Sequence, residues 1–176
     1  MSGPLKTLDV VRVKLVLDRK LYSEELLNNS RAVYEVMKTE LIDYDREAFC
    51  ILNMKTNGQC INMNIASMGG LNYAYVEPRE VFKSAILSNA NHIILVHNHP
   101  SGSVAPTKDD ILLTQRLVEC GKMLGIKVCD HVIIGGITGE MYSFQDHGLM
   151  EGMERTTIEH QEKEQVAENK ENRKQR

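Results

Sequence analysis

Residues 97–110 read H-N-H-P-S-G-S-V-A-P-T-K-D-D, and they follow the apolar run I-I-L-V. If that run is a β-strand, the side chains of His97 and His99 leave its end on the same face. A loop with glycine and proline follows, and a helix then begins near Thr107 with Asp110 in its first turn. Two imidazoles and a carboxylate, with an open position, are typical of a catalytic zinc site rather than a structural one.

The same residues allow other interpretations. Thr107 and Asp110 fit a helix capping box, in which the hydroxyl and the carboxylate bond to each other's backbone N–H groups. The capping role is compatible with metal binding, because Thr107 can cap the helix while Asp110 faces the ion. H-N-H also names a nuclease class, but that class takes its residues from separate positions of a hairpin and a helix. Three adjacent residues of a strand alternate faces and cannot reproduce that arrangement.

The pattern around this stretch predicts an α/β domain in which a mixed β-sheet is flanked by helices. Asn57-Gly58 predicts a hairpin turn, Pro78 fits the first position of a helix, and Gly125 fits a C-cap. We expect strands at 10–18, 49–54, 60–66, 92–97, 127–134 and 141–144, with a short extended piece at 73–76. We expect helices from Ser23 or from Asn29-Ser30 to about Leu41, from Pro78, and from Thr107 to Gly125.

Length and composition suit one domain. The chain has 176 residues and 42% hydrophobic residues, which is enough for a core. We expect a domain at 1–150 and a charged C-terminal tail at 151–176 that is disordered or becomes helical with a partner. The sequence contains no run of eighteen apolar residues, so no membrane span is expected. The N-terminus lacks an apolar signal core.

Charge and cysteine content narrow the function classes. The net charge is -3, so the strongly basic face of an autonomous nucleic-acid binder is not expected. The four cysteines form no C-x-x-C pair and lie in apolar runs. They are interpreted as buried free thiols of a cytoplasmic protein. The sequence leaves the oligomeric state open, a homo-oligomer included.

Beyond these inferences, the chain resembles the RadC-like branch of the JAB/MPN superfamily over roughly residues 20 to 150. That branch has H-x-H, seven residues, Ser or Thr, two residues and Asp, which match His97, His99, Thr107 and Asp110. The flanking segments E-P-R-E-V-F, N-H-I-I-L-V-H-N-H-P, D-H-V-I-I-G and Y-S-F are similar to the same branch.

The resemblance implies a JAB/MPN (cytidine deaminase-like) architecture and a JAMM-type metalloprotease. His97, His99 and Asp110 would bind one Zn²⁺ ion, and an upstream glutamate would act as general base on the zinc-bound water. Better-known members of the superfamily are isopeptidases, so the resemblance implies a protein or peptide substrate. No interaction with a membrane is expected. A hydroxyl at Thr107 can donate to the oxyanion formed during amide hydrolysis.

The general base must lie well upstream of the metal motif. Glu47 is favoured because it stands just before the predicted strand 49–54, where the superfamily usually has this residue. Glu80 and Glu77 are weaker alternatives, since acidic residues at a helix start also favour the helix dipole. Ser101 and His131 are candidates for contacts behind the ligands, although such a histidine can be purely structural.

Two departures from the RadC-like branch qualify the resemblance. Thr107 stands where serine is common; the hydroxyl is kept, but its rotamers are restricted. Longer members carry an N-terminal helix-hairpin-helix-like DNA-binding region, whereas this chain begins almost at its first predicted strand. DNA binding is therefore not carried over from the family, and direct nucleic-acid binding is not expected. The alternative functions are a non-catalytic zinc-binding JAB module and an accessory protein in DNA repair or processing.

Overall fold

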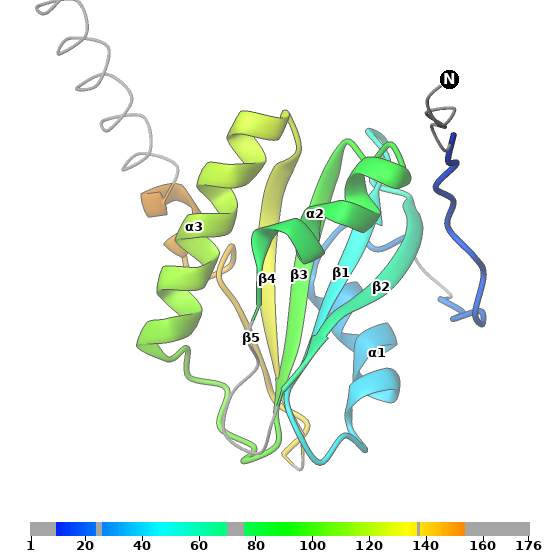
Figure 1. The fold of residues 1–176 in the computed structure, drawn as a ribbon. Helices are drawn as coiled ribbons and strands as arrows, with labels where there is room; N and C mark the ends of the chain where they lie inside the picture. Colours follow the sequence, from blue (N-terminus) through cyan, green and yellow to red (C-terminus); the bar gives the residue numbers. More distant parts are fainter. Residues whose placement is uncertain (1–9, 24–25, 70–75, 137, 154–176) are drawn as a thin grey trace, which may run out of the picture.

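The computed structural model describes residues 10–23, 26–69, 76–136 and 138–153. In these ranges one mixed sheet with the strand order β2-β1-β3-β4-β5 is covered by helices on both faces (Figure 1). The elements in chain order are α1 (Ser30–Leu41), β1 (Ala48–Met54), β2 (Cys60–Met68), α2 (Pro78–Leu87), β3 (His92–His99), α3 (Lys108–Leu124), β4 (Lys127–Gly135) and β5 (Met141–Ser143). The predicted α/β class with a mixed sheet is confirmed.

The centre of the sheet is formed by β1 and β3, which run antiparallel to each other. β1 also pairs antiparallel with β2, β3 pairs parallel with β4, and β4 pairs antiparallel with β5. The parallel pair is joined through α3, as parallel strands require a crossover connection. β1 is buried along its whole length, because helices cover both faces of the sheet.

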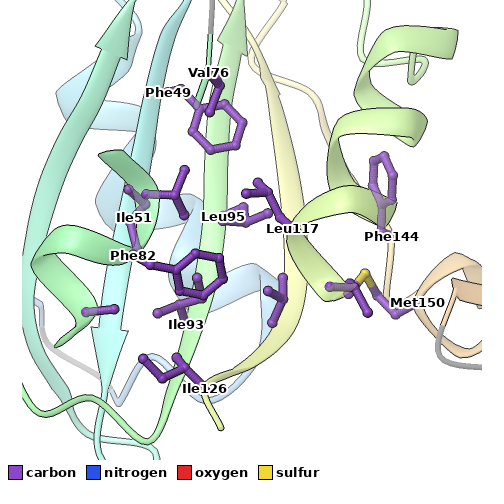
Figure 2. Packing of buried hydrophobic residues seen from close by; sticks show 14 of the residues in the cluster. Phe49, Ile51, Val76, Phe82, Ile93, Leu95, Leu117, Ile126, Phe144 and Met150 are labelled. Carbon is purple, nitrogen blue, oxygen red and sulfur yellow. The ribbon is translucent and has the colours of Figure 1, made fainter. Parts of the chain in front are cut away.

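Two apolar layers lie on opposite faces of the sheet. On one face, Phe82 of α2 and Leu117 of α3 pack against β3 residues such as Leu95 (Figure 2). On the other face, α1 packs against β4 and β3, and buried residues of β1 and β3, Val96 among them, belong to the same apolar cluster. Because alternate strand residues face opposite sides, the side chains that continue the Leu95 series, such as His97, point to the α3 side.

The local signals at the element ends are confirmed. Asn29 caps α1 by accepting a hydrogen bond from the Ala32 N–H at 2.8 Å. Pro78 opens α2, and Gly125 ends α3 with φ at 69°, a left-handed conformation that glycine adopts without strain. Gly58 has φ at 78° in the turn between β1 and β2, as the predicted hairpin requires.

The predicted strand at 10–18 is wrong. Residues 10–23 have no regular secondary structure, and the side chains of Val10 and Val16 are 95% and 78% exposed. An alternating pattern supplies an apolar face, but a strand also needs a hydrogen-bonded neighbour. In the described part of the chain no strand pairs with this segment.

The first helix starts at Ser30, and Ser23 is not helical. Residues 24–25 and residues 73–75 of the predicted extended piece lie outside the described residues. All four cysteines lie in the described residues and form no disulfide, but only Cys50 is fully buried, so the expectation of four buried thiols was too broad.

The chain continues into the core beyond β5. Met150 and Met153 are buried with Phe144 in the layer on the α3 side. The predicted boundary at residue 150 stays a prediction, since residues 154–176 lie outside the described part. Within the described ranges, we find no helix with the length and apolar character needed to span a membrane.

Candidate metal centre

His97, His99 and Asp110 meet at the carboxyl end of β3 and the start of α3. Nε2 of His97 lies 2.9 Å from Nε2 of His99 and 3.2 Å from Oδ1 of Asp110. Nε2 of His99 lies 3.5 Å from Oδ2 of Asp110. Zinc–ligand bonds of about 2.0–2.1 Å in a tetrahedral site place the ligand atoms about 3.3–3.5 Å apart. The separations in this cluster are therefore close to those that one zinc ion needs.

The protonation of His99 follows from its second ring nitrogen. Nδ1 lies 2.7 Å from the backbone carbonyl oxygen of Ser103, which can only accept a hydrogen bond. Nδ1 therefore carries the hydrogen, and in the neutral ring Nε2 has a free lone pair. The loop that supplies this carbonyl turns at Gly102, where φ is 85°.

The tautomer of the neutral His97 ring is set by a chain of buried hydrogen bonds. The Thr114 hydroxyl donates to the carbonyl oxygen of Asp110 at 2.6 Å, so its oxygen accepts from Nδ1 of His131 at 2.6 Å. Nε2 of His131 then carries a lone pair and accepts from Nδ1 of His97 at 2.7 Å. In the neutral ring, Nε2 of His97 consequently also has a free lone pair, and it faces the cluster.

His131 is suited to this neutral role. Its ring is fully buried, and burial together with the nearby His97 holds the pKa of His131 well below its usual value. The ring packs against Phe49 and Phe144 at centroid distances of 5.4 and 4.9 Å. His131 therefore contacts His97, one of the three candidate ligands.

Asp110 serves the cluster and the helix at the same time. Its Oδ2 accepts the Thr107 backbone N–H at 2.8 Å and the Thr107 hydroxyl at 2.6 Å, and its N–H donates to that hydroxyl at 3.2 Å. The capping box is thus present, while Oδ1 faces His97. Burial would raise the pKa of Asp110, but hydrogen bonds with His97, His99 and Thr107 outweigh it and hold this pKa far below its usual range.

With both rings neutral, the Nε2 lone pairs of His97 and His99 and the ionised carboxylate of Asp110 face the same point. Such electron-rich atoms repel one another unless a proton or a cation lies between them. Imidazole nitrogen and carboxylate oxygen are also the donors that a catalytic zinc site combines with an open fourth position. The donor set therefore fits a divalent metal ion.

Glu47 precedes β1 and is half-buried. Phe49 pairs with His97 in the sheet, and extending this antiparallel register by two residues places Glu47 opposite His99. Glu47 stands two residues before Phe49, whose ring stacks on His97 with centroids 5.9 Å apart.

The charge of Glu47 reaches the cluster. Burial lowers the pKa of His99, but Asp110 and the Ser103 carbonyl raise it more, Glu47 adds to them, and the pKa is raised overall. The alternative glutamates pair elsewhere, since Glu80 contacts Lys83 and Glu77 lies 3.8 Å from Arg116. Of the three glutamates considered, Glu47 is the one whose charge acts on a residue of the cluster.

The second residue expected behind the ligands, Ser101, lies elsewhere. Its side chain is exposed, and its hydroxyl accepts from the Ser103 N–H at 3.4 Å rather than contacting a ligand. The carbonyl of Ser103 holds His99 instead. Thr114 was missed from the sequence, although its place four residues after Asp110 puts both on one side of α3. The contact of Ser103 could not be predicted from the sequence, because every residue has a backbone carbonyl.

A family model and the sequences of known relatives were compared with the chain, and both indicate the same family. The family model for the RadC-like JAB domain matches residues 27–149. A UPF0758 protein of Methanosarcina mazei is 40% identical over 124 residues, which cover 70% of this chain and 53% of that protein. A UPF0758 protein of Syntrophomonas wolfei is 50% identical over 106 residues, covering 60% of this chain and 45% of that protein.

A third relative covers more of the chain. The UPF0758 protein of Desulforamulus reducens is 41% identical over 153 residues, which are 84% of this chain and 66% of that protein. The chain spans about half to two thirds of the length of these curated relatives. The family model covers most of the described residues, including both histidines, Asp110 and Glu47. The chain therefore belongs to the RadC-like JAB domain family.

Proposed function

We propose that the chain is a metal-dependent hydrolase of JAMM type that uses zinc to cleave an amide bond in a protein or peptide. The observation that carries this proposal is the convergence of three possible metal-donor atoms, from His97, His99 and Asp110, together with the charge of Glu47 acting on His99. A structural zinc site would use four protein ligands. In the described part of the chain the metal-ligating group consists of three, which leaves a position for chemistry.

A bound zinc ion would supply Lewis acidity and lower the pKa of coordinated water to about 7. Glu47 is the proposed general base and acid: it takes a proton from the attacking water and passes it to the departing amine. The Thr107 hydroxyl lies 2.6 Å from Oδ2 of Asp110, and turning it toward a developing oxyanion would stabilise that charge.

The residues behind the cluster keep its donors in one orientation. His131 and the Ser103 carbonyl hold the two imidazoles by their Nδ1 atoms. Such contacts fix the tautomer and the ring direction of a metal-ligating histidine. Their presence supports a preformed metal site rather than a chance group of polar residues.

The test combines metal content with hydrolysis. The protein is purified without chelators, its zinc is measured by mass spectrometry, and reloading is followed after chelation. The loaded protein is then assayed with fluorogenic peptides and isopeptide-linked substrates. Glu47→Gln should keep stoichiometric zinc and lose about 10²–10⁴-fold in turnover. Glu80→Gln is the matched control, because Glu80 is exposed and pairs with Lys83; it should behave like the wild type.

Four results would contradict the proposal. A protein that holds no stoichiometric zinc and cannot be reloaded is not a zinc hydrolase. Wild-type turnover in Glu47→Gln would remove Glu47 as the base. Partner binding that survives both chelation and Asp110→Ala, without hydrolysis, would indicate a non-catalytic module. Salt-sensitive binding to duplex or forked DNA would favour an accessory role in DNA processing.

A further inference from the structure

Asn98 separates the two histidines of the cluster and faces the other side of the sheet. The side chains of His97 and His99 point to the α3 side, so strand alternation directs Asn98 to the α1 side. Asn98 is fully buried, with 0% exposure. A buried amide without partners is costly, so its hydrogen bonds show what it does in this position.

The Asn98 amide binds the backbone of β1 at two points. Its Oδ1 accepts the Ala48 N–H at 2.8 Å, and its Nδ2 donates to the Arg46 carbonyl oxygen at 3.0 Å. These two residues flank Glu47 on either side. The Glu47 carbonyl itself accepts the Gly69 N–H at 2.8 Å. The backbone around Glu47 is therefore held at three successive residues.

This anchorage matters because Glu47 lies at a strand end. The regular strand begins only at Ala48, and the residues before it form turns and bends. Residues at an element end fray unless they are tied down. Asn98 holds the backbone from the α1 side, while the charge of Glu47 acts on His99, whose side chain points to the α3 side. One short amide thus couples the position of a carboxylate to the strand that carries both histidines.

We propose that Asn98 is a positioning residue that fixes the Glu47 carboxylate relative to the metal-ligating cluster. The consequence for turnover rests on the proposed function, in which Glu47 is the general base. The anchorage itself does not, because it concerns the backbone from Arg46 to Ala48. All three residues of H-N-H then have a role, with two donors on one face and the anchor of the base on the other.

Asn53 provides a matched control for the loss of a buried asparagine. It is also fully buried in the sheet, near the far end of β1, and its Nδ2 donates to Asn62 and Ser84. Asn53→Ala therefore removes an interior amide of the same kind without touching the cluster. Effects shared by Asn98→Ala and Asn53→Ala reflect stability, and effects confined to Asn98→Ala report on Glu47.

Amide hydrogen exchange tests the anchorage in metal-free protein, independently of activity. In Asn98→Ala the Ala48 N–H loses its acceptor, so we expect its exchange to become at least about tenfold faster than in Asn53→Ala. Asn98→Asp has the same shape and keeps an acceptor for Ala48 but no donor for Arg46, so it should fall between the two. An unchanged Ala48 exchange rate in folded Asn98→Ala would overturn the inference, whatever the protein catalyses.

Cobalt(II) tests the position of the carboxylate. With Co²⁺ bound, paramagnetic relaxation of the Glu47 side-chain carboxyl carbon measures its nearness to the ion. We expect this relaxation to fall in Asn98→Ala and to be unchanged in Asn53→Ala, with one Co²⁺ bound in each. Equal relaxation in all three proteins would overturn the positioning role.

Turnover on the fluorogenic peptides should fall about 10²-fold in Asn98→Ala, as expected for a misplaced reacting group, with KM changed little. A displaced carboxylate with full turnover would uphold the anchorage and refute Glu47 as the base. The failure of the proposed function and the failure of this inference are therefore distinguishable.

Discussion

Nε2 of the buried His131 lies 2.7 Å from Nδ1 of His97, directly behind a nitrogen that faces the candidate metal site. His131 comes from β4 and His97 from the neighbouring parallel strand β3. The hydrogen-bond chain ends at Thr114, whose hydroxyl binds the backbone carbonyl of Asp110. Two of the three candidate ligands are thus connected through groups that touch no ion themselves.

Replacing His131 by phenylalanine should weaken metal binding. His131→Phe keeps a ring between Phe49 and Phe144 but leaves Nδ1 of His97 without its acceptor. Loss of such a partner costs about 10–100-fold in metal affinity. Competition with a chromogenic zinc chelator measures the change. His147→Phe is the control, since His147 is exposed and stacks on Tyr142. Equal affinities in the two variants would show that the relay does not orient His97.

Thr114→Val should have an effect in the same direction from the other end of the relay. Valine keeps the shape of the buried side chain but removes the hydroxyl that His131 and the Asp110 carbonyl share. If both residues act through His97, the affinity losses of Thr114→Val and His131→Phe are non-additive in a double-mutant cycle. Thr39→Val controls for loss of a helical hydroxyl, because Thr39 donates to the Val36 carbonyl in α1. Fully additive losses would argue against one connected chain.

The elements and the three candidate ligands could be predicted because their signals are local. Spacing placed His97 and His99 on one strand face, and the capping pattern placed Asp110 at the start of α3. The strand predicted at 10–18 was wrong, because an alternating side-chain pattern alone cannot show whether a neighbouring strand is available. The anchor role of Asn98 was also not predicted, because it depends on which residues of β1 lie next to β3 in the sheet.

Lowering the pH from 8.5 to 5.5 should strengthen the contribution of the His99–Asp110 pair to the stability of the metal-free protein. The pKa of Asp110 is depressed, so its contribution is present above the ordinary carboxyl pKa of about 4 and is lost as the pH falls through the lower folded value. The pKa of His99 is raised, so its contribution is present below about 6.5 and is lost as the pH rises through the folded value. Their pairing therefore stabilises the fold most between about pH 4 and 6.5.

Urea unfolding in the presence of a chelator measures this dependence. The difference in unfolding free energy between wild type and Asp110→Asn should be larger at pH 5.5 than at pH 8.5. Asp109→Asn is the control, because Asp109 lies in the same first turn of α3 but is exposed and outside the cluster. A difference that is equal at both pH values would show that His99 and Asp110 are not paired in solution.

Substitutions of Thr107 should separate helix capping from catalysis. Thr107→Val removes the hydroxyl that bonds the N–H and the carboxylate of Asp110. Loss of an N-cap costs about 1 kcal/mol of unfolding free energy, and loss of an oxyanion donor costs about 10²–10³-fold in kcat. Thr107→Ser keeps the hydroxyl and should keep both properties. Chemical denaturation and steady-state kinetics of the zinc-loaded proteins give the two quantities.

Asn29→Ala supplies the comparison that distinguishes the two roles. Asn29 caps α1 through the Ala32 N–H, so its loss should lower stability by about the same amount without changing kcat. If Thr107→Val lowers only stability, to the same extent as Asn29→Ala, then its hydroxyl serves the helix alone. A fall in kcat confined to Thr107→Val, with zinc still bound, would instead place this hydroxyl at the reacting carbonyl, because stability and metal content are then matched.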